Sequence, residues 1–77
     1  MDLHQASILK EYQITEINFQ VDLEMGTRLM HLGFLPGEKI KVIRKTPFTS
    51  DSLLIEVRGT KMALTKNEAK LVNIIEL

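Results

Sequence analysis

The fold is decided around residues 28–37, which read RLMHLGFLPG. The apolar residues at helical spacing stop at Gly33, where a left-handed residue can close a helix and glycine does so without Cβ strain. Phe34 takes the position that often packs back on the last helical turn. Pro36 and Gly37 suit the central positions of a type II turn, in which proline presets φ and glycine supplies a positive φ. The stretch therefore predicts a helix joined to a strand by a short turn, with Gly33, Pro36 and Gly37 in structural roles.

The helix is expected to begin after Asp22, whose carboxylate can accept hydrogen bonds from the first free amides and suits the positive helix end. Met25, Leu29 and Leu32 fall at i, i+4 and i+7, so they are predicted to form one apolar stripe. Met30 lies off this stripe and is expected at its border or in solvent.

A glycine, Gly26, lies in the middle of this predicted helix. It lowers helix stability by roughly 1 kcal/mol relative to alanine. It marks either the close approach of another backbone or a tolerated weakness. The helix is only about three turns long, so packing rather than propensity must hold it.

Alternating apolar and polar residues predict strands on both sides of the helix. We expect strands over residues 11–19, 38–46, 53–57, 62–64 and 71–75. Changes of parity near Thr15 and Glu16, and again at Ile43, indicate β-bulges or bends. Arg58 and Gly59 begin a tight hairpin, and a glycine followed by a polar residue favours a type II′ turn.

The remaining segments complete the predicted architecture. Residues 1–10 are expected to form an N-terminal arm and residues 11–77 the folded domain, with a connecting loop at 47–52. Thr65 and Glu68 match a capping box that starts a single helical turn. The last strand is predicted to pair with the first and to close the sheet. The fold class is mostly β with short helices: a small SH3-like, partly closed barrel of about five strands with one helix inserted after the first.

Composition narrows the class of function. A chain of 77 residues makes one domain, and its ten basic and ten acidic side chains cancel. Nucleic-acid modules usually carry a basic excess, so no nucleic-acid partner is expected. With no cysteine, disulfides, thiolate metal sites and cysteine nucleophiles are excluded. No apolar run approaches the ~20 residues of a membrane span, and no signal-peptide core is visible. We expect a cytoplasmic protein.

The sequence resembles the FeoA family, small proteins associated with bacterial ferrous iron uptake. The resemblance covers roughly residues 11–77. It rests first on residues 28–37, and then on four further runs in the same order: YQIT at 12–15, VIRKTP at 42–47, IEVRG at 55–59 and MALTKNEA at 62–69. The chain departs from the family pattern in the loop after Pro47, where Gly-Asp-Pro is common and only Asp51 matches. It departs again at Thr65, where many members have arginine.

The resemblance implies a partner role in ferrous iron transport rather than an enzyme. It implies contact with the cytosolic face of the membrane-bound GTP-driven permease FeoB, and through it an association with the inner membrane. A homo-oligomer is a further expectation. The alternative is a stand-alone regulatory module that acts on iron-dependent transcription, because the same domain resembles the C-terminal SH3-like module of iron-dependent repressors.

The helix end carries more apolar residues than so small a domain is expected to bury, and exposed apolar clusters often mark a partner site. The candidate partner-binding residues are Leu29, Met30, Leu32, Phe34, Leu35 and Arg58. We expect no catalytic residues, no metal ligands and no cofactor. His31 lacks convergent ligands in the sequence, so a structural or surface role is favoured. A set of basic residues is interpreted as a solvated sheet face: Lys39, Lys41, Arg44, Lys45, Arg58 and Lys61.

Overall fold

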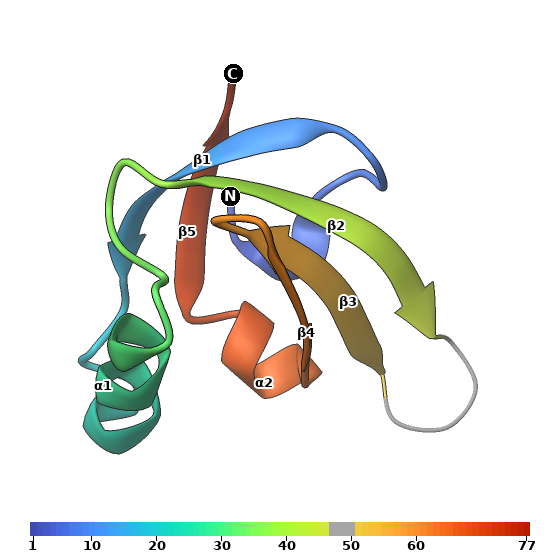
Figure 1. The fold of residues 1–77 in the computed structure, drawn as a ribbon. Coiled ribbons are helices and arrows are strands. Elements are labelled where there is room, and N and C mark those ends of the chain that lie inside the picture. Colours follow the sequence, from blue (N-terminus) through green and yellow to red (C-terminus); the bar gives the residue numbers. More distant parts are fainter. Residues whose placement is uncertain (47–50) are drawn as a thin grey trace.

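The computed structural model describes residues 1–46 and 51–77 (Figure 1). The elements are a 3₁₀ turn η1 (Leu3–Gln5), strand β1 (Glu11–Ile17), helix α1 (Leu23–His31), strands β2 (Lys39–Thr46), β3 (Ser52–Val57) and β4 (Thr60–Leu64), helix α2 (Lys66–Ala69) and strand β5 (Val72–Glu76). The order of strands and helices is the predicted one. The predicted loop at 47–52 falls mainly on residues 47–50, outside the described residues.

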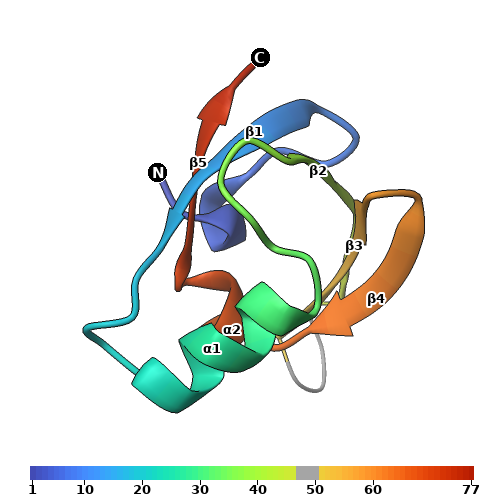
Figure 2. The same ribbon diagram turned by 60° about the vertical axis from the view of Figure 1, so that its left-hand side comes forward.

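The five strands form one antiparallel sheet in the order β4-β3-β2-β1-β5. The predicted pairing of the last strand with the first is confirmed, since β5 lies beside β1. The sheet curls strongly (Figure 2), yet β4 and β5 remain its two edges. The expectation that the last strand closes the sheet is therefore wrong. The chain leaves the sheet at Thr65 to start α2. The N-terminus lies on the outer side of β5, where the Ile74 N–H donates to Met1 O at 2.8 Å.

Two bulges bend the sheet where the sequence predicted them. The register between β1 and β5 shifts between Ile14 and Glu16, and that between β2 and β3 shifts between Val42 and Arg44. An extra residue in one strand bends it and increases its twist. These bulges give the sheet its curl and so enclose the core on one face.

The hairpin between β3 and β4 differs from the prediction. Its two central residues are Arg58, with φ 54°, and Gly59, with φ 76°. A type II′ turn has a positive φ only at its first central residue, whereas type I′ has it at both, so the turn belongs to type I′ and the type II′ prediction is wrong. The two-residue turn also lets β4 begin at Thr60, two residues earlier than expected.

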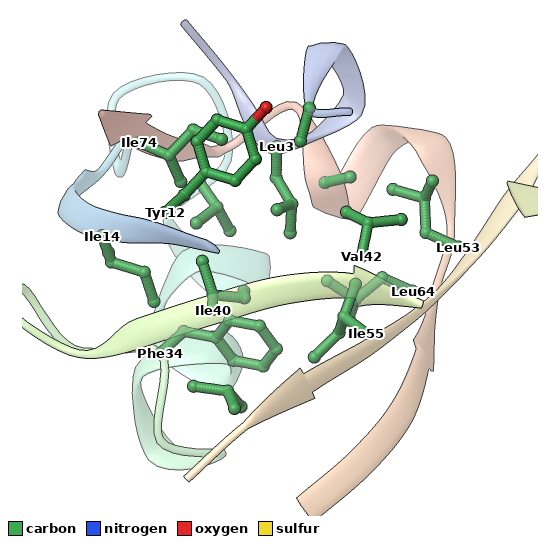
Figure 3. Close-up of a cluster of buried hydrophobic side chains, with 14 of the residues drawn as sticks. Leu3, Tyr12, Ile14, Phe34, Ile40, Val42, Leu53, Ile55, Leu64 and Ile74 are labelled. Atoms are coloured by element: carbon green, nitrogen blue, oxygen red, sulfur yellow. The ribbon is translucent and has the colours of Figure 1, made fainter. Parts of the chain in front are cut away.

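The core lies inside the curled sheet (Figure 3). It is built from apolar residues of every strand together with residues from the end of α1 and the N-terminus. Its largest fully buried side chains include Tyr12, Phe34, Leu3, Ile14, Leu29, Ile40, Ile55 and Ile74. Burial of this apolar surface is the main favourable term in folding such a small domain.

Residues 1–10 pack against the body of the domain. Leu3 and Ala6 are buried in the same core as the strands. Asp2 caps η1 by accepting from the Gln5 N–H, and the Ser7 N–H donates to the hydroxyl of the buried Tyr12 at 2.8 Å. The segment that the sequence suggested as an arm thus contributes Leu3 and Ala6 to the core.

Candidate partner-binding site at the end of helix α1

Helix α1 begins and ends at the residues that the sequence indicated. The Asp22 carboxylate accepts from the Met25 N–H at 3.0 Å. At the other end, the Gly33 N–H donates to Met30 O and the Phe34 N–H donates to Leu29 O, each at 3.1 Å. This pair of bonds, with Gly33 at φ 105°, is a Schellman cap.

The cap divides the apolar residues of the helix end into two groups. Leu29 and Phe34 are fully buried in the same core cluster, and they hold the two positions whose apolar side chains often pack together in a Schellman cap. Leu32, by contrast, is 49% exposed, and Met30 is 37% exposed. Leu35 is half-buried. Of these five candidate residues, three thus reach solvent and two are part of the core. The predicted stripe is correct at Leu29, which is buried, but Leu32, the C-cap residue, is half exposed.

The β3–β4 turn brings Arg58 to the same place. A Cβ placed on Gly33 would lie 3.4 Å from Cδ of Arg58, so the arginine side chain passes over the helix cap. Its guanidinium lies 3.6 Å from the Glu38 carboxylate, and the side chain is mostly exposed. Arg58 is therefore a charged neighbour of the exposed apolar residues, although it lies 25 positions after Gly33 in the sequence.

The turn that follows the cap is fixed to the sheet. The Glu38 N–H donates to Leu35 O at 3.1 Å across Pro36 and Gly37, and Gly37 has φ 93°. The Gly37 N–H also donates to Ile14 O at 2.7 Å. This geometry confirms the turn expected from the sequence. It presents Leu35 on a rigid connection rather than on a free loop.

An ion pair between α1 and α2 holds the helix against the domain. The Arg28 guanidinium donates to the Glu68 carboxylate, which is almost fully buried. The same carboxylate accepts from the Thr65 N–H at 2.8 Å, as the predicted capping box requires. Burial acts to raise the pKa of Glu68, but the hydrogen bonds with Thr65 and the ion pair with Arg28 outweigh it and hold this pKa below its ordinary value.

Two of the basic residues, Lys41 and Lys61, alternate with acids in one row across the sheet. The registers place Glu11 beside Lys41, Lys41 beside Glu56, and Glu56 beside Lys61. Neighbouring side chains on one sheet face interact, and opposite charges stabilise the pairs modestly. The row carries no excess of positive charge. This arrangement fits the interpretation of a solvated sheet face.

His31 is the last residue of α1 and is exposed. Within residues 1–46 and 51–77, no three side chains among His, Cys, Asp and Glu come together in a way that could hold a metal ion. None of the helices in this described part of the chain is long and apolar enough to cross a membrane.

Two features of the site were missed by sequence reasoning. Arg28 and Glu68 are 40 residues apart, and no local pattern pairs them. Leu23, at 68% exposure, and the neighbouring Val21 are exposed apolar residues at the start of α1. A helical wheel could have found Leu23, since it lies away from the Met25 and Leu29 stripe.

The fold and this surface define a class of protein: a small SH3-like β domain with an exposed apolar helix end. Comparison of the sequence with models of protein families identifies the family. The FeoA domain matches residues 1–76, and the chain belongs to the FeoA family.

Solved structures agree with this assignment. The FeoA protein of Stenotrophomonas maltophilia is 28% identical over 97% of this chain and 89% of its own, with a TM-score of 0.84. That protein was crystallised with zinc and is described as a prokaryotic SH3 domain protein and a candidate activating factor for ferrous iron transport. The FeoA protein of Chlorobium tepidum is 25% identical over 100% of this chain and 70% of its own, with a TM-score of 0.81.

A manganese-dependent transcriptional repressor shares the fold at 13% identity, over 100% of this chain and 41% of its own, with a TM-score of 0.87. A comparison with functionally curated proteins gives no match. The family links the chain to ferrous iron transport, whereas the likeness to the repressor concerns the fold alone.

Proposed function

We propose that this protein is a cytoplasmic, non-catalytic accessory factor of ferrous iron uptake that acts by contact with the membrane-bound GTP-driven permease FeoB. The observation that carries the proposal is the exposure of Met30, Leu32 and Leu35 around a rigid cap in a chain of the FeoA family. The description of the Stenotrophomonas relative as a candidate transport-activating factor supports the same role.

The proposed contact surface consists of Met30, Leu32, Leu35 and Arg58. Exposed apolar side chains rimmed by a charge are typical of partner sites, and methionine adapts to irregular surfaces. Leu29 and Phe34 contribute by fixing the cap from below, since both are buried. An arginine at the rim would steer association more than it would add affinity.

The mechanism that fits this surface is occupancy of a docking site. A protein that binds one conformation of the permease better than another shifts its equilibrium by that difference in affinity. The rigid turn over Pro36 and Gly37 favours this reading, because a preformed surface loses little conformational entropy on binding.

The alternative, a module that acts on transcription, has less support. The likeness to the manganese-dependent repressor is at 13% identity and concerns the fold. The row of Glu11, Lys41, Glu56 and Lys61 also alternates in charge, so this row is not a basic stripe for a phosphate backbone. A gel shift on nonspecific DNA that weakens with salt would favour this alternative.

The proposal is tested by ferrous iron uptake in cells that carry the permease and variants of this protein. Met30→Glu places a charge on the proposed surface and should abolish the contribution of this protein to uptake while leaving the fold intact. Ile75→Glu is the control, because Ile75 is 51% exposed on the edge strand β5, away from α1. Normal uptake with a folded Met30→Glu variant would contradict the proposal.

A further inference from the structure

The exposed side of α1 carries two pairs of adjacent residues, each made of one apolar and one polar side chain. Leu23 and Glu24 form an apolar–acidic pair at its start, and Met30 and His31 form an apolar–imidazole pair seven residues later. Seven residues make almost two helical turns, so the two pairs lie on the same side of the helix. Thr27 lies midway between them.

The side chains of these two pairs are accessible to a binding partner. Leu23 is among the most exposed large apolar residues of the described chain, and Met30 is also exposed. Glu24 and His31 are exposed too, and neither makes a side-chain hydrogen bond or an ion pair within the described residues. A shallow hollow of about 550 Å³ borders this side of the helix. Its lining includes Glu24, Thr27 and His31 together with Arg28 and Leu32, whereas Leu23 and Met30 lie outside it.

The pattern is self-complementary for two copies that run antiparallel. A twofold axis near Thr27 would place Leu23 and Glu24 of one copy against Met30 and His31 of the other, and repeat the contact by symmetry. Apolar side chains would then meet each other, and the imidazole N–H could donate to the carboxylate. The antiparallel arrangement also sets the positive start of one helix dipole against the negative end of the other.

We propose that this face of α1 binds a second copy of the chain and forms an antiparallel α1–α1 homodimer. This inference goes beyond the proposed function, and because Met30 is common to both surfaces, the dimer would cover part of the permease contact. The helix has nine residues and is about 14 Å long. A contact between two helices of this length is expected to bury less than the roughly 1,200 Å² of accessible surface that stable interfaces bury. The dimer is therefore expected to be weak, with a dissociation constant of about 0.1–1 mM.

The test is sedimentation equilibrium of the purified full chain from about 10 μM to about 1 mM, together with the concentration dependence of its amide NMR shifts. The wild type should dimerise, with the largest shift changes in residues 22–32. His31→Glu places a like charge opposite Glu24 at both symmetric contacts. Glu24→Lys removes the carboxylate that would accept from the imidazole N–H. Each single variant should weaken dimerisation about tenfold.

The double variant Glu24→Lys/His31→Glu exchanges the two sides and should restore dimerisation to within about threefold of the wild type. Glu11→Lys reverses a charge on β1, away from α1, and is the matched control. A chain that stays monomeric over the whole range would overturn the proposal. So would a double variant no better than the singles, or shift changes confined to another surface. All measurements use this protein alone, so their outcome is separate from that of the uptake assay.

Discussion

The packing of α1 on the domain can be tested at Gly26, where two effects of opposite sign compete. Replacing this glycine with alanine should favour the helix by about 1 kcal/mol. The added Cβ, however, would lie 2.7 Å from Cδ1 and 3.2 Å from Cε1 of Phe19, and 3.3 Å from Cγ2 of Ile17. Ordinary carbon contacts are about 3.5–4.0 Å, so the Phe19 ring must move by roughly 1 Å. Overpacking of this kind costs about 1–3 kcal/mol.

We therefore expect Gly26→Ala to lower the free energy of unfolding by about 0–2 kcal/mol, measured by urea denaturation. Phe19→Ala removes the two closest atoms, so Gly26→Ala in that background should be neutral or stabilising by up to about 1 kcal/mol. The double-mutant cycle should give a coupling energy of about 1–3 kcal/mol. A coupling energy near zero would refute this account of the packing, since it would mean that the Phe19 ring does not constrain the helix.

Four further variants probe the site and its supports. Leu29→Ala should cost about 3–5 kcal/mol because Leu29 is fully buried, whereas Leu32→Ala should cost less than about 0.5 kcal/mol, and equal losses in urea melts would contradict the division made by the cap. Gly33→Ala should cost about 1–2 kcal/mol through its positive φ alone, and a more stable variant would show that the cap does not need it. The folded pKa of Glu68 is lowered, so its contribution is present above the unfolded pKa and is lost as pH falls through the folded value. Glu68→Gln should therefore flatten the acid side of the stability profile, and an unchanged slope below about pH 5 would count against the ion pair.

The helix end could be predicted because its information is local. A glycine at the cap and a Pro-Gly pair specify backbone angles within a few residues, and the structure has them as expected. The two bulges could be predicted equally well, because an extra residue changes which alternate positions of the strand are apolar. The division of the apolar residues could be predicted only in part. The cap indicated that Phe34 packs inward, and Met30 lay off the predicted stripe, whereas the exposure of Leu32 was not expected.

Contacts between distant parts of the chain account for the other differences. Leu3 and Ala6 carry no long periodic pattern, and they are buried in one cluster with strand residues that are distant in the sequence. Arg28 finds Glu68 across 40 residues. The sheet stays open because the chain turns away at α2, and a count of strands alone does not show this. The surplus of apolar residues at the helix end was nevertheless a sound guide to the exposed surface.

The central claim, that the exposed end of α1 contacts the permease, is tested most directly by binding to the permease itself. Tagged wild-type protein and the Leu32→Glu and Ile75→Glu variants are used to capture the permease from solubilised membranes. These two side chains are matched in exposure, at 49% and 51%. We predict that the wild type and Ile75→Glu retain the permease and that Leu32→Glu, while folded, loses it. Equal capture by both variants would contradict the claim.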